Sequence, residues 1–279
     1  MKRYTTRSDI NLAVDTLKAD GGFVLEGLIE AHEVDQMNEF LDDKGSTYKQ
    51  LYFEENWGFG NVMAEPTFSS IIENTWVSKL AQARFSCSFS HNHLVCNEKA
   101  PFVGYEVEWH QEVFNINTFA PGCPPAMAED FFIQAFIALD EQGPSNGGLM
   151  VMPQSNKLGV LDSIDVLSPA LTHKKSVTVD DLKRADVNGG VMCPELRPGD
   201  ALIFSPLLVH GSVRNFSEKR RRSLVLQLTS NSVPDRNEEV YEREVEYRKD
   251  FATINLQYQI DKLTGSNLYD GLKKVVKNG

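Results

Sequence analysis

The chain has 279 residues, of which 41% are hydrophobic, enough to build one sizeable apolar core. Its formal net charge of −11 at pH 7 argues against nucleic-acid or anionic-membrane partners, because their phosphate groups would be repelled. No apolar run approaches the ~20 residues that span a bilayer, and the first residues lack the apolar stretch of a signal peptide. We therefore expect a cytoplasmic protein, as a monomer or a homodimer.

The N-terminal part of the chain predicts helices around one short strand. Ser8-Asp9 can cap a helix over 10–19, which Gly21-Gly22 end, and the apolar run 23–25 predicts a strand. Apolar residues at helical spacing predict two further helices, over 31–41 and 68–83. These elements form a helical support over about residues 1–83.

From residue 85 the pattern changes to short apolar runs separated by turn residues, which predicts many short strands. Helices followed by such strands favour an α+β, mainly β chain with a sandwich or barrel core over about 84–230. The polar segment 160–195 predicts an excursion that could serve as a lid, and the charged tail 231–279 predicts an outer helix. The predicted strands are 85–97, 107–114, 131–139, 149–152, 201–204, 207–213 and 223–228.

The cysteines and several histidines lack the spacing of a metal site. The pair His91 and His93 could share a strand face, but no carboxylate in a matching context accompanies it, and His32 opens a helix facing solvent. We expect structural or surface roles for these histidines and reduced, structural thiols for the cysteines. The remaining members of this group are His173, Cys87, Cys96, Cys123 and Cys193.

A stronger candidate metal site begins at His110 and Glu112. They lie two apart in a run that alternates like a strand, so both would project from one face with Gln111 turned away. His210, on a strand far along the chain, is the best third ligand. Two histidines and one carboxylate are the facial triad of non-haem iron(II) enzymes, although an HxE pair alone is a weak signal.

A basic cluster, 219–222, runs directly into the alternating strand 223–228. Arg221 has the same parity as Ser223 and Gln227, whereas three leucines form the opposite face. If the leucines pack against helices, Arg221 points inward and needs an anion, because an unpaired buried charge is costly. A dicarboxylic co-substrate would supply that anion, with Arg222 as the alternative arginine. The three leucines are Leu224, Leu226 and Leu228.

With these residues the sequence resembles the phytanoyl-CoA dioxygenase family of iron(II)/2-oxoglutarate oxygenases, over about residues 20–230. The order and spacing of several motifs carry the resemblance rather than any single motif. Glu112 stands where the family usually has Asp, which leaves the coordination geometry open and argues against a halogenase, and Asn156 replaces a histidine that is not a ligand. The matching segments are 22–28, 109–112, 137–140, 146–149, 151–159, 197–200, 210–212 and Arg221.

The resemblance implies one oxygenase domain over 1–279 with a double-stranded β-helix core, which is a jelly-roll, cupin-like fold. It implies Fe(II), held by His110, Glu112 and His210, with 2-oxoglutarate and O2 as co-substrates. Arg221 would be essential for catalysis, because it holds the distal carboxylate of 2-oxoglutarate. Ser212 would hold the same carboxylate, Asn97 would contact the co-substrate, and Gln134 and Phe136 would line its pocket.

The implied reaction is oxidation of a small-molecule substrate, by default hydroxylation, with conversion of 2-oxoglutarate to succinate and CO2. Desaturation, epoxidation or ring closure would use the same residues. No second basic patch favours a coenzyme A thioester. Two alternatives remain: an inactive jelly-roll sensor, and a cupin-type metal-dependent isomerase or hydrolase. Candidate substrate contacts are Phe114, Asn115, Asn117 and Arg214, together with the excursion 160–195.

Overall fold

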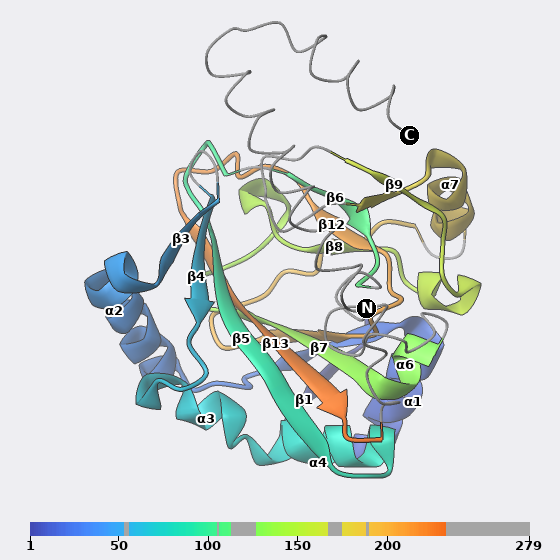
Figure 1. Cartoon of the computed structure of the whole chain (residues 1–279), viewed down its shortest axis with the longest axis horizontal. Coiled ribbons are helices and arrows are strands. Elements are labelled where there is room, and N and C mark those ends of the chain that lie inside the picture. Colours follow the sequence, from blue (N-terminus) through green and yellow to red (C-terminus); the bar gives the residue numbers. More distant parts are fainter. Residues whose placement is uncertain (53–55, 105, 113–126, 167–174, 188–189, 233–279) are drawn as a thin grey trace, which may run out of the picture.

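Two β-sheets packed face to face, with helices against the larger one, make up the core (Figure 1). The computed structural model describes residues 1–52, 56–104, 106–112, 127–166, 175–187 and 190–232. Helices α1, α2, α3 and α4 cover the outer face of the large sheet, and the small sheet lies over its inner face. This arrangement confirms the predicted jelly-roll core with N-terminal helices.

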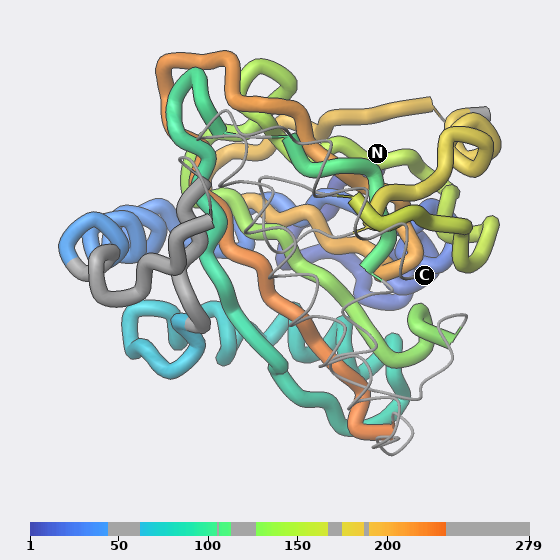
Figure 2. The backbone as a smooth tube through the Cα atoms, turned by 45° about the horizontal axis from the view of Figure 1, so that its top comes forward, coloured from blue at the N-terminus to red at the C-terminus, as the bar shows by residue number. Residues whose placement is uncertain are grey.

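The large sheet has the order β1-β2-β11-β7-β13-β5-β4-β3, the small sheet β6-β12-β8, and β9 pairs with β10. In the large sheet the strands are β1 (Arg3–Thr5), β2 (Gly22–Glu26), β3 (Lys49–Tyr52), β4 (Asn56–Asn61), β5 (Phe89–Lys99), β7 (Phe132–Ala138), β11 (Ala201–Phe204) and β13 (Arg221–Ser230). The others are β6 (Val107–His110), β8 (Met150–Val151), β12 (His210–Ser212), β9 (Ser163–Asp165) and β10 (Lys175–Val177). Figure 2 shows β5, β13 and β7, which are distant in sequence, running side by side.

The helices begin and end largely where the sequence provides caps. The Asp9 carboxylate accepts a hydrogen bond from the Asn11 amide at 2.8 Å, and Gly21 ends the first helix with φ 78°. The α-helices are α1 (Ile10–Asp20), α2 (Ala31–Tyr48), α3 (Ser69–Ile72), α4 (Thr75–Phe85), α6 (Ala128–Phe131) and α7 (Val179–Val187). The short 3-10 helices are η1 (Pro66–Phe68), η3 (Pro144–Asn146) and η4 (Ser155–Leu158).

Several predicted boundaries are wrong. The helix expected over 68–83 is divided into α3 and α4, because Asn74 lies between them and its side chain accepts hydrogen bonds from the first amides of α4. Helix α2 extends beyond the predicted 31–41, and the strands β1, β3 and β4 were not predicted. The predicted strand 107–114 ends at His110, whereas β13 is longer than expected because β5 and β7 pair with it on both sides.

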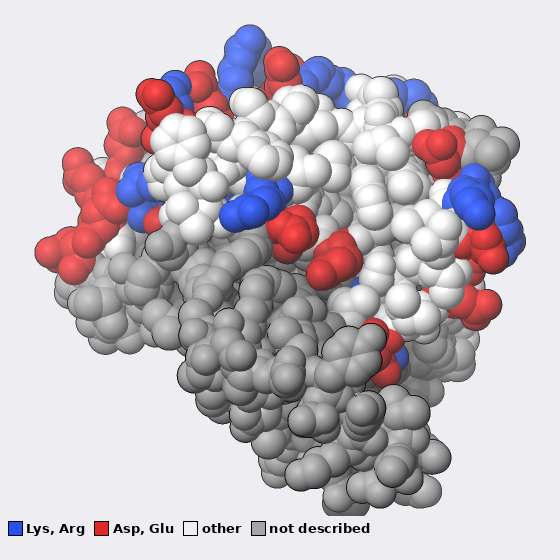
Figure 3. Space-filling view, turned by 90° about the horizontal axis from the view of Figure 1, so that it is seen from above, with Lys and Arg blue, Asp and Glu red and all other residues white. Residues whose placement is uncertain are grey.

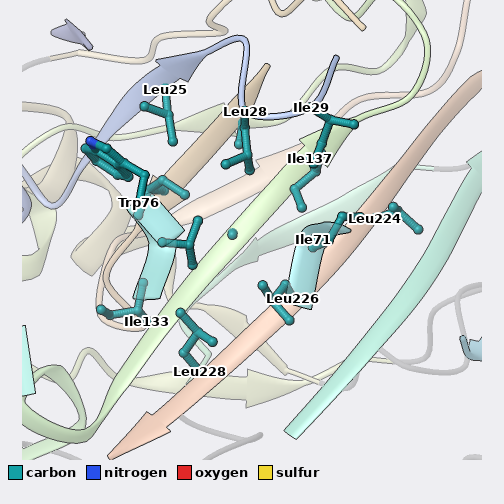
Figure 4. Packing of buried hydrophobic residues seen from close by; sticks show 14 of the residues in the cluster. Leu25, Leu28, Ile29, Ile71, Trp76, Ile133, Ile137, Leu224, Leu226 and Leu228 are labelled. Atoms are coloured by element: carbon teal, nitrogen blue, oxygen red, sulfur yellow. The ribbon is translucent and has the colours of Figure 1, made fainter. Parts of the chain in front are cut away.

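The main apolar core lies between the helices and the outer face of the large sheet (Figure 4). Leu224, Leu226 and Leu228 of β13 are fully buried in it, beside Ile133 and Ile137 of β7. Burying each leucine contributes about 1.5–3 kcal/mol, so this face fixes which side of β13 is turned outward. The alternate residues of β13 therefore face the small sheet, as the sequence predicted.

The excursion 160–195 contains β9, β10 and α7 in its described part. The predicted tail helix and His173 lie outside the described residues, as does Cys123. The other three cysteines are free thiols. Among the described residues, no helix is long and apolar enough to cross a membrane. On the face drawn in Figure 3, acidic and basic side chains are interspersed along the edge of the described surface, around an uncharged area.

Candidate metal centre

The two histidines of the predicted triad lie directly opposite each other in the small sheet. Strands β6 and β12 are antiparallel, and His110 and His210 are register partners. Their ring centroids are 4.1 Å apart, so both imidazoles project to the same side of the sheet. The hydrogen-bonding register of this strand pair thus brings together two residues that are far apart in the chain.

Glu112 completes the group, but from a turn rather than from a strand. Because β6 ends at His110, the alternation argument does not apply to Glu112, and this part of the prediction is wrong. Instead, the Glu112 amide donates to the Pro206 carbonyl at 2.8 Å, which ties the turn to the segment before β12. Glu112 Oε1 lies 3.6 Å from His110 Nε2 and 3.3 Å from His210 Nε2.

Gln111 points away from this group, as predicted, and anchors the turn. Its side chain is buried, and its amide nitrogen donates to the carbonyls of Gly159 and Leu207 at 2.9 and 2.7 Å. Its amide oxygen accepts from the Leu161 amide at 2.9 Å. Three hydrogen bonds to two separate loops therefore fix the backbone between the two ligand candidates.

Both imidazoles are oriented by backbone carbonyls. The Nδ1 atom of His110 lies 2.7 Å from the Glu108 carbonyl, and that of His210 lies 2.8 Å from the Leu208 carbonyl. A carbonyl only accepts, so Nδ1 carries a proton in each ring, and Nε2 is the ring atom directed toward Glu112. Metal-binding histidines are commonly oriented in this way.

The protonation states also suit a metal. Burial alone would raise the pKa of Glu112, but hydrogen bonds and charges from His110 and His210 lower it well below its ordinary value. Burial lowers the pKa of His210, and the His110 charge acts in the same direction. One ligand atom from each of the three residues lies within 4.8 Å of the others. Two imidazoles and one carboxylate on one side match the ligand set of a non-haem iron(II) site.

Arg221 lies on the inner face of the large sheet, and the structure distinguishes it from Arg222. Arg221 is 3% exposed, its guanidinium lies 5.4 Å from the Phe136 ring centroid, and it donates to Ser223 Oγ at 2.8 Å. Arg222 points outward and forms ion pairs with Glu98 and Asp42. Arg221 is therefore the arginine that faces the interior.

The other predicted co-substrate residues lie on or beside the same inner face. Asn97 of β5 is the register partner of Ser223, and Phe136 of β7 is the register partner of Val225. Ser212, at the end of β12, accepts a hydrogen bond from Lys99 Nζ at 2.7 Å. Lys99 was not predicted as a site residue, although it has the same strand parity as Asn97, which could have identified it.

A row of four residues crosses the large sheet opposite the triad. At one end of the row, the Phe204 ring lies 4.8 Å from the His210 ring. At the other end lies His93. Burial lowers the pKa of His93, and the Glu112 charge acts in the opposite direction. Gln134 and Gln227 lie between them as register partners. Gln134 Oε1 and both amide atoms of Gln227 are buried without a hydrogen-bond partner among the described residues. Of these four residues, only Gln134 was predicted from the sequence as a site residue.

The predicted substrate contacts are described only in part. Phe114, Asn115 and Asn117 lie outside the described residues, and Arg214 has an exposed side chain. A surface hollow near Glu141, Glu195 and Arg197 contains no residue of the triad. It therefore lies apart from the candidate metal centre.

The fold and the metal centre agree with the comparison with protein families. Residues 14–223 match the model of phytanoyl-CoA dioxygenase (PhyH), and the chain belongs to this family. The family uses Fe(II), 2-oxoglutarate and O2, and the three candidate ligands fit that requirement. Family membership supports an oxidoreductase of the Fe(II)/2-oxoglutarate-dependent class.

Among individual relatives, the methylphosphonate hydroxylase of Gimesia maris is 30% identical over 123 residues, 44% of this chain. The match spans 42% of that relative's own length. EctD from S. alaskensis, solved with 2-oxoglutarate and 5-hydroxyectoine, has a TM-score of 0.63 and 19% identity, covering 82% of this chain and 78% of EctD. The epimerase SnoN, solved with Fe3+, alpha ketoglutarate and nogalamycin RO, has a TM-score of 0.65 and 14% identity, covering 82% and 86%. Both structures show the fold.

Proposed function

We propose that this protein is a 2-oxoglutarate-dependent dioxygenase that hydroxylates a small polar metabolite, with iron held by His110, Glu112 and His210. The observation that carries the proposal is the register pairing of the two histidines, with Glu112 Oε1 within 3.6 Å of both Nε2 atoms. Bound iron(II) would supply the centre where 2-oxoglutarate and O2 react, giving succinate, CO2 and hydroxylated substrate.

The residues of the chain would prepare the site before any reaction. The Glu108 and Leu208 carbonyls hold the imidazole rings in the tautomer that ligates through Nε2. Gln111 fixes the turn, so the Glu112 carboxylate would hold a metal without reorganisation. A carboxylate that stays ionised is also the form that binds a cation.

Arg221 would bind the distal carboxylate of 2-oxoglutarate. Its guanidinium is buried, has no carboxylate partner among the described residues, and lies beside Phe136. A planar guanidinium can hold a carboxylate by two parallel hydrogen bonds, which fixes the orientation of the co-substrate as well as its affinity. Ser212, Asn97 and Gln134 would complete the walls of the co-substrate site.

The substrate would bind against the polar row of the large sheet. The unpartnered Gln134 Oε1 atom can accept a hydrogen bond, and the unpartnered amide of Gln227 can donate and accept, which suits a polar substrate. The likeness to a methylphosphonate hydroxylase makes methylphosphonate the first compound to assay. An alkylphosphonate would present such oxygen atoms beside a C–H bond.

The test begins with anaerobic protein, iron(II) and 2-oxoglutarate, which should give a weak visible charge-transfer absorption. Oxygen should then release succinate, and methylphosphonate should be assayed for faster release and a hydroxylated product. The His210→Ala variant should lose both signals. Absorption without succinate would indicate a binding protein, and absence of both signals would overturn the proposal.

A further inference from the structure

Lys99 is a buried cation that none of the proposed steps uses. It is the last residue of β5, is 4% exposed, and is the direct register partner of Arg221. Two like charges facing each other across a buried strand pair are destabilising unless an anion neutralises them. Among the described residues, neither cation has a carboxylate in ion-pair contact, whereas neighbouring Arg222 pairs with Glu98 and Asp42.

The surrounding backbone makes room for this lysine. A Cβ atom added at Gly104 would lie 2.5 Å from the Lys99 Cβ. A Cβ atom at Gly147, which has φ 74°, would lie 2.9 Å from the Lys99 Cδ and 3.3 Å from its Nζ. Asn215 fixes the start of this turn, since its side chain donates to the Lys99 carbonyl at 3.2 Å and its amide donates to the Gly104 carbonyl at 2.9 Å. Lys99 is therefore held in one position rather than extended into solvent.

The contacts of the ammonium group point to a ligand site. Lys99 Nζ donates to Ser212 Oγ at 2.7 Å and to the Val213 carbonyl at 2.6 Å, and an ammonium group has a third hydrogen to donate. Because Ser212 Oγ accepts from Lys99, its own hydroxyl hydrogen is available to donate to another acceptor. Arg221 Nε also lacks a partner among the described residues. Donors from three residues thus remain available on one side of the inner face.

We infer that Lys99 is a positioning residue that, with Arg221 and through Ser212, holds the distal carboxylate of a dicarboxylic 2-oxo acid. The inference rests on the proposed function, because it concerns the same co-substrate. Burial lowers the pKa of Lys99 well below its ordinary value, the Arg221 charge acts in the same direction, and Glu106 opposes both. A bound carboxylate would favour the charged ammonium, so Lys99 contributes to affinity only when the distal carboxylate is present.

The test compares two co-substrates that share the metal-binding 2-oxo acid group. 2-Oxoglutarate carries a distal carboxylate and pyruvate lacks one, so the ratio of their dissociation constants isolates the contribution of that carboxylate. Both constants are measured by anaerobic titration of the iron(II) protein, followed by its absorption. The Lys99→Met variant keeps the length of the side chain and removes its charge, and Lys219→Met is the exposed control.

Lys99→Met should weaken 2-oxoglutarate binding about tenfold or more and leave pyruvate binding within about twofold, whereas Lys219→Met should change neither. If both acids weaken equally, Lys99 has only a structural role, and the inference fails while the proposed function stands. If Lys99→Met changes neither dissociation constant, the inference fails as well. If the wild-type protein binds neither acid, the proposed function itself fails. Should Lys99→Met not fold, Lys99→Gln gives the same ratio test.

Discussion

The Nε2 atom of His210 lies 3.3 Å from Oε1 of Glu112, although 98 residues separate them in the chain. Neither residue alone marks a metal site, since buried histidine–carboxylate contacts also occur in structural roles. The contact is informative because His110 joins it from the strand beside His210. All three groups direct their ligand atoms to one point, and each is fixed by neighbouring backbone.

The charge of Glu112 should dominate metal affinity. Glu112→Gln keeps the shape of the side chain but removes the anion, so iron(II) affinity should fall about tenfold or more. Anaerobic calorimetry with iron(II) or cobalt(II) measures this change. The exposed Glu141→Gln variant is the matched control and should bind as the wild type does. Equal affinity in Glu112→Gln would remove this residue from the ligand set.

Gln111 should matter for stability as well as for the site. Gln111→Ala leaves two carbonyls and one amide without their buried partner, which should lower the free energy of unfolding by about 3 kcal/mol. Urea unfolding measures this, and Gln36→Ala, at an exposed position of α2, should change it by less than about 0.5 kcal/mol. Metal affinity should fall with Gln111→Ala too, because the turn that carries Glu112 loses its anchor. A variant as stable as the wild type would contradict the anchoring role.

Substitution of Arg221 should affect 2-oxoglutarate binding, whereas substitution of Arg222 should affect stability. Arg222→Met removes the ion pairs with Glu98 and Asp42, of which only Asp42 keeps a second arginine among the described residues, Arg220. It should lower the free energy of unfolding by about 3 kcal/mol, with 2-oxoglutarate affinity retained. Arg221→Met should instead weaken 2-oxoglutarate binding. Thermal unfolding and anaerobic titration on the same samples compare the two variants. The reverse pattern would assign the co-substrate to Arg222.

The affinity for 2-oxoglutarate should depend on pH through Lys99. The free protein has a lowered Lys99 pKa, and a bound carboxylate would raise it, so binding takes up a proton. Affinity should therefore fall as pH rises above the lowered pKa of the free protein, until the higher pKa of the complex is passed. Burial lowers the pKa of Arg221 to about 10, so measurements between about pH 7 and 9 mainly report Lys99. A profile that stays equally steep in Lys99→Met would exclude this lysine as the source.

The sequence predicted most of the fold correctly where the pattern is local. Alternation along β13 correctly placed the leucines outside and Arg221 inside, because side-chain direction in a strand follows parity alone. The pairs Ser8-Asp9 and Gly21-Gly22 likewise predicted both ends of α1, where Asp9 and Gly21 are the caps. The end of a strand depends less on the local pattern. The run through Glu112 alternates like a strand, yet β6 ends at His110.

By itself the sequence determined the identity of the three candidate ligands and the inward face of Arg221, since motif spacing and parity are properties of a short stretch of chain. Only the tertiary structure decided that His110 pairs with His210, that Glu112 comes from a turn held by Pro206, and that Lys99 lies opposite Arg221. The physical reason is that register between distant strands depends on the packing of whole sheets, which no single strand encodes.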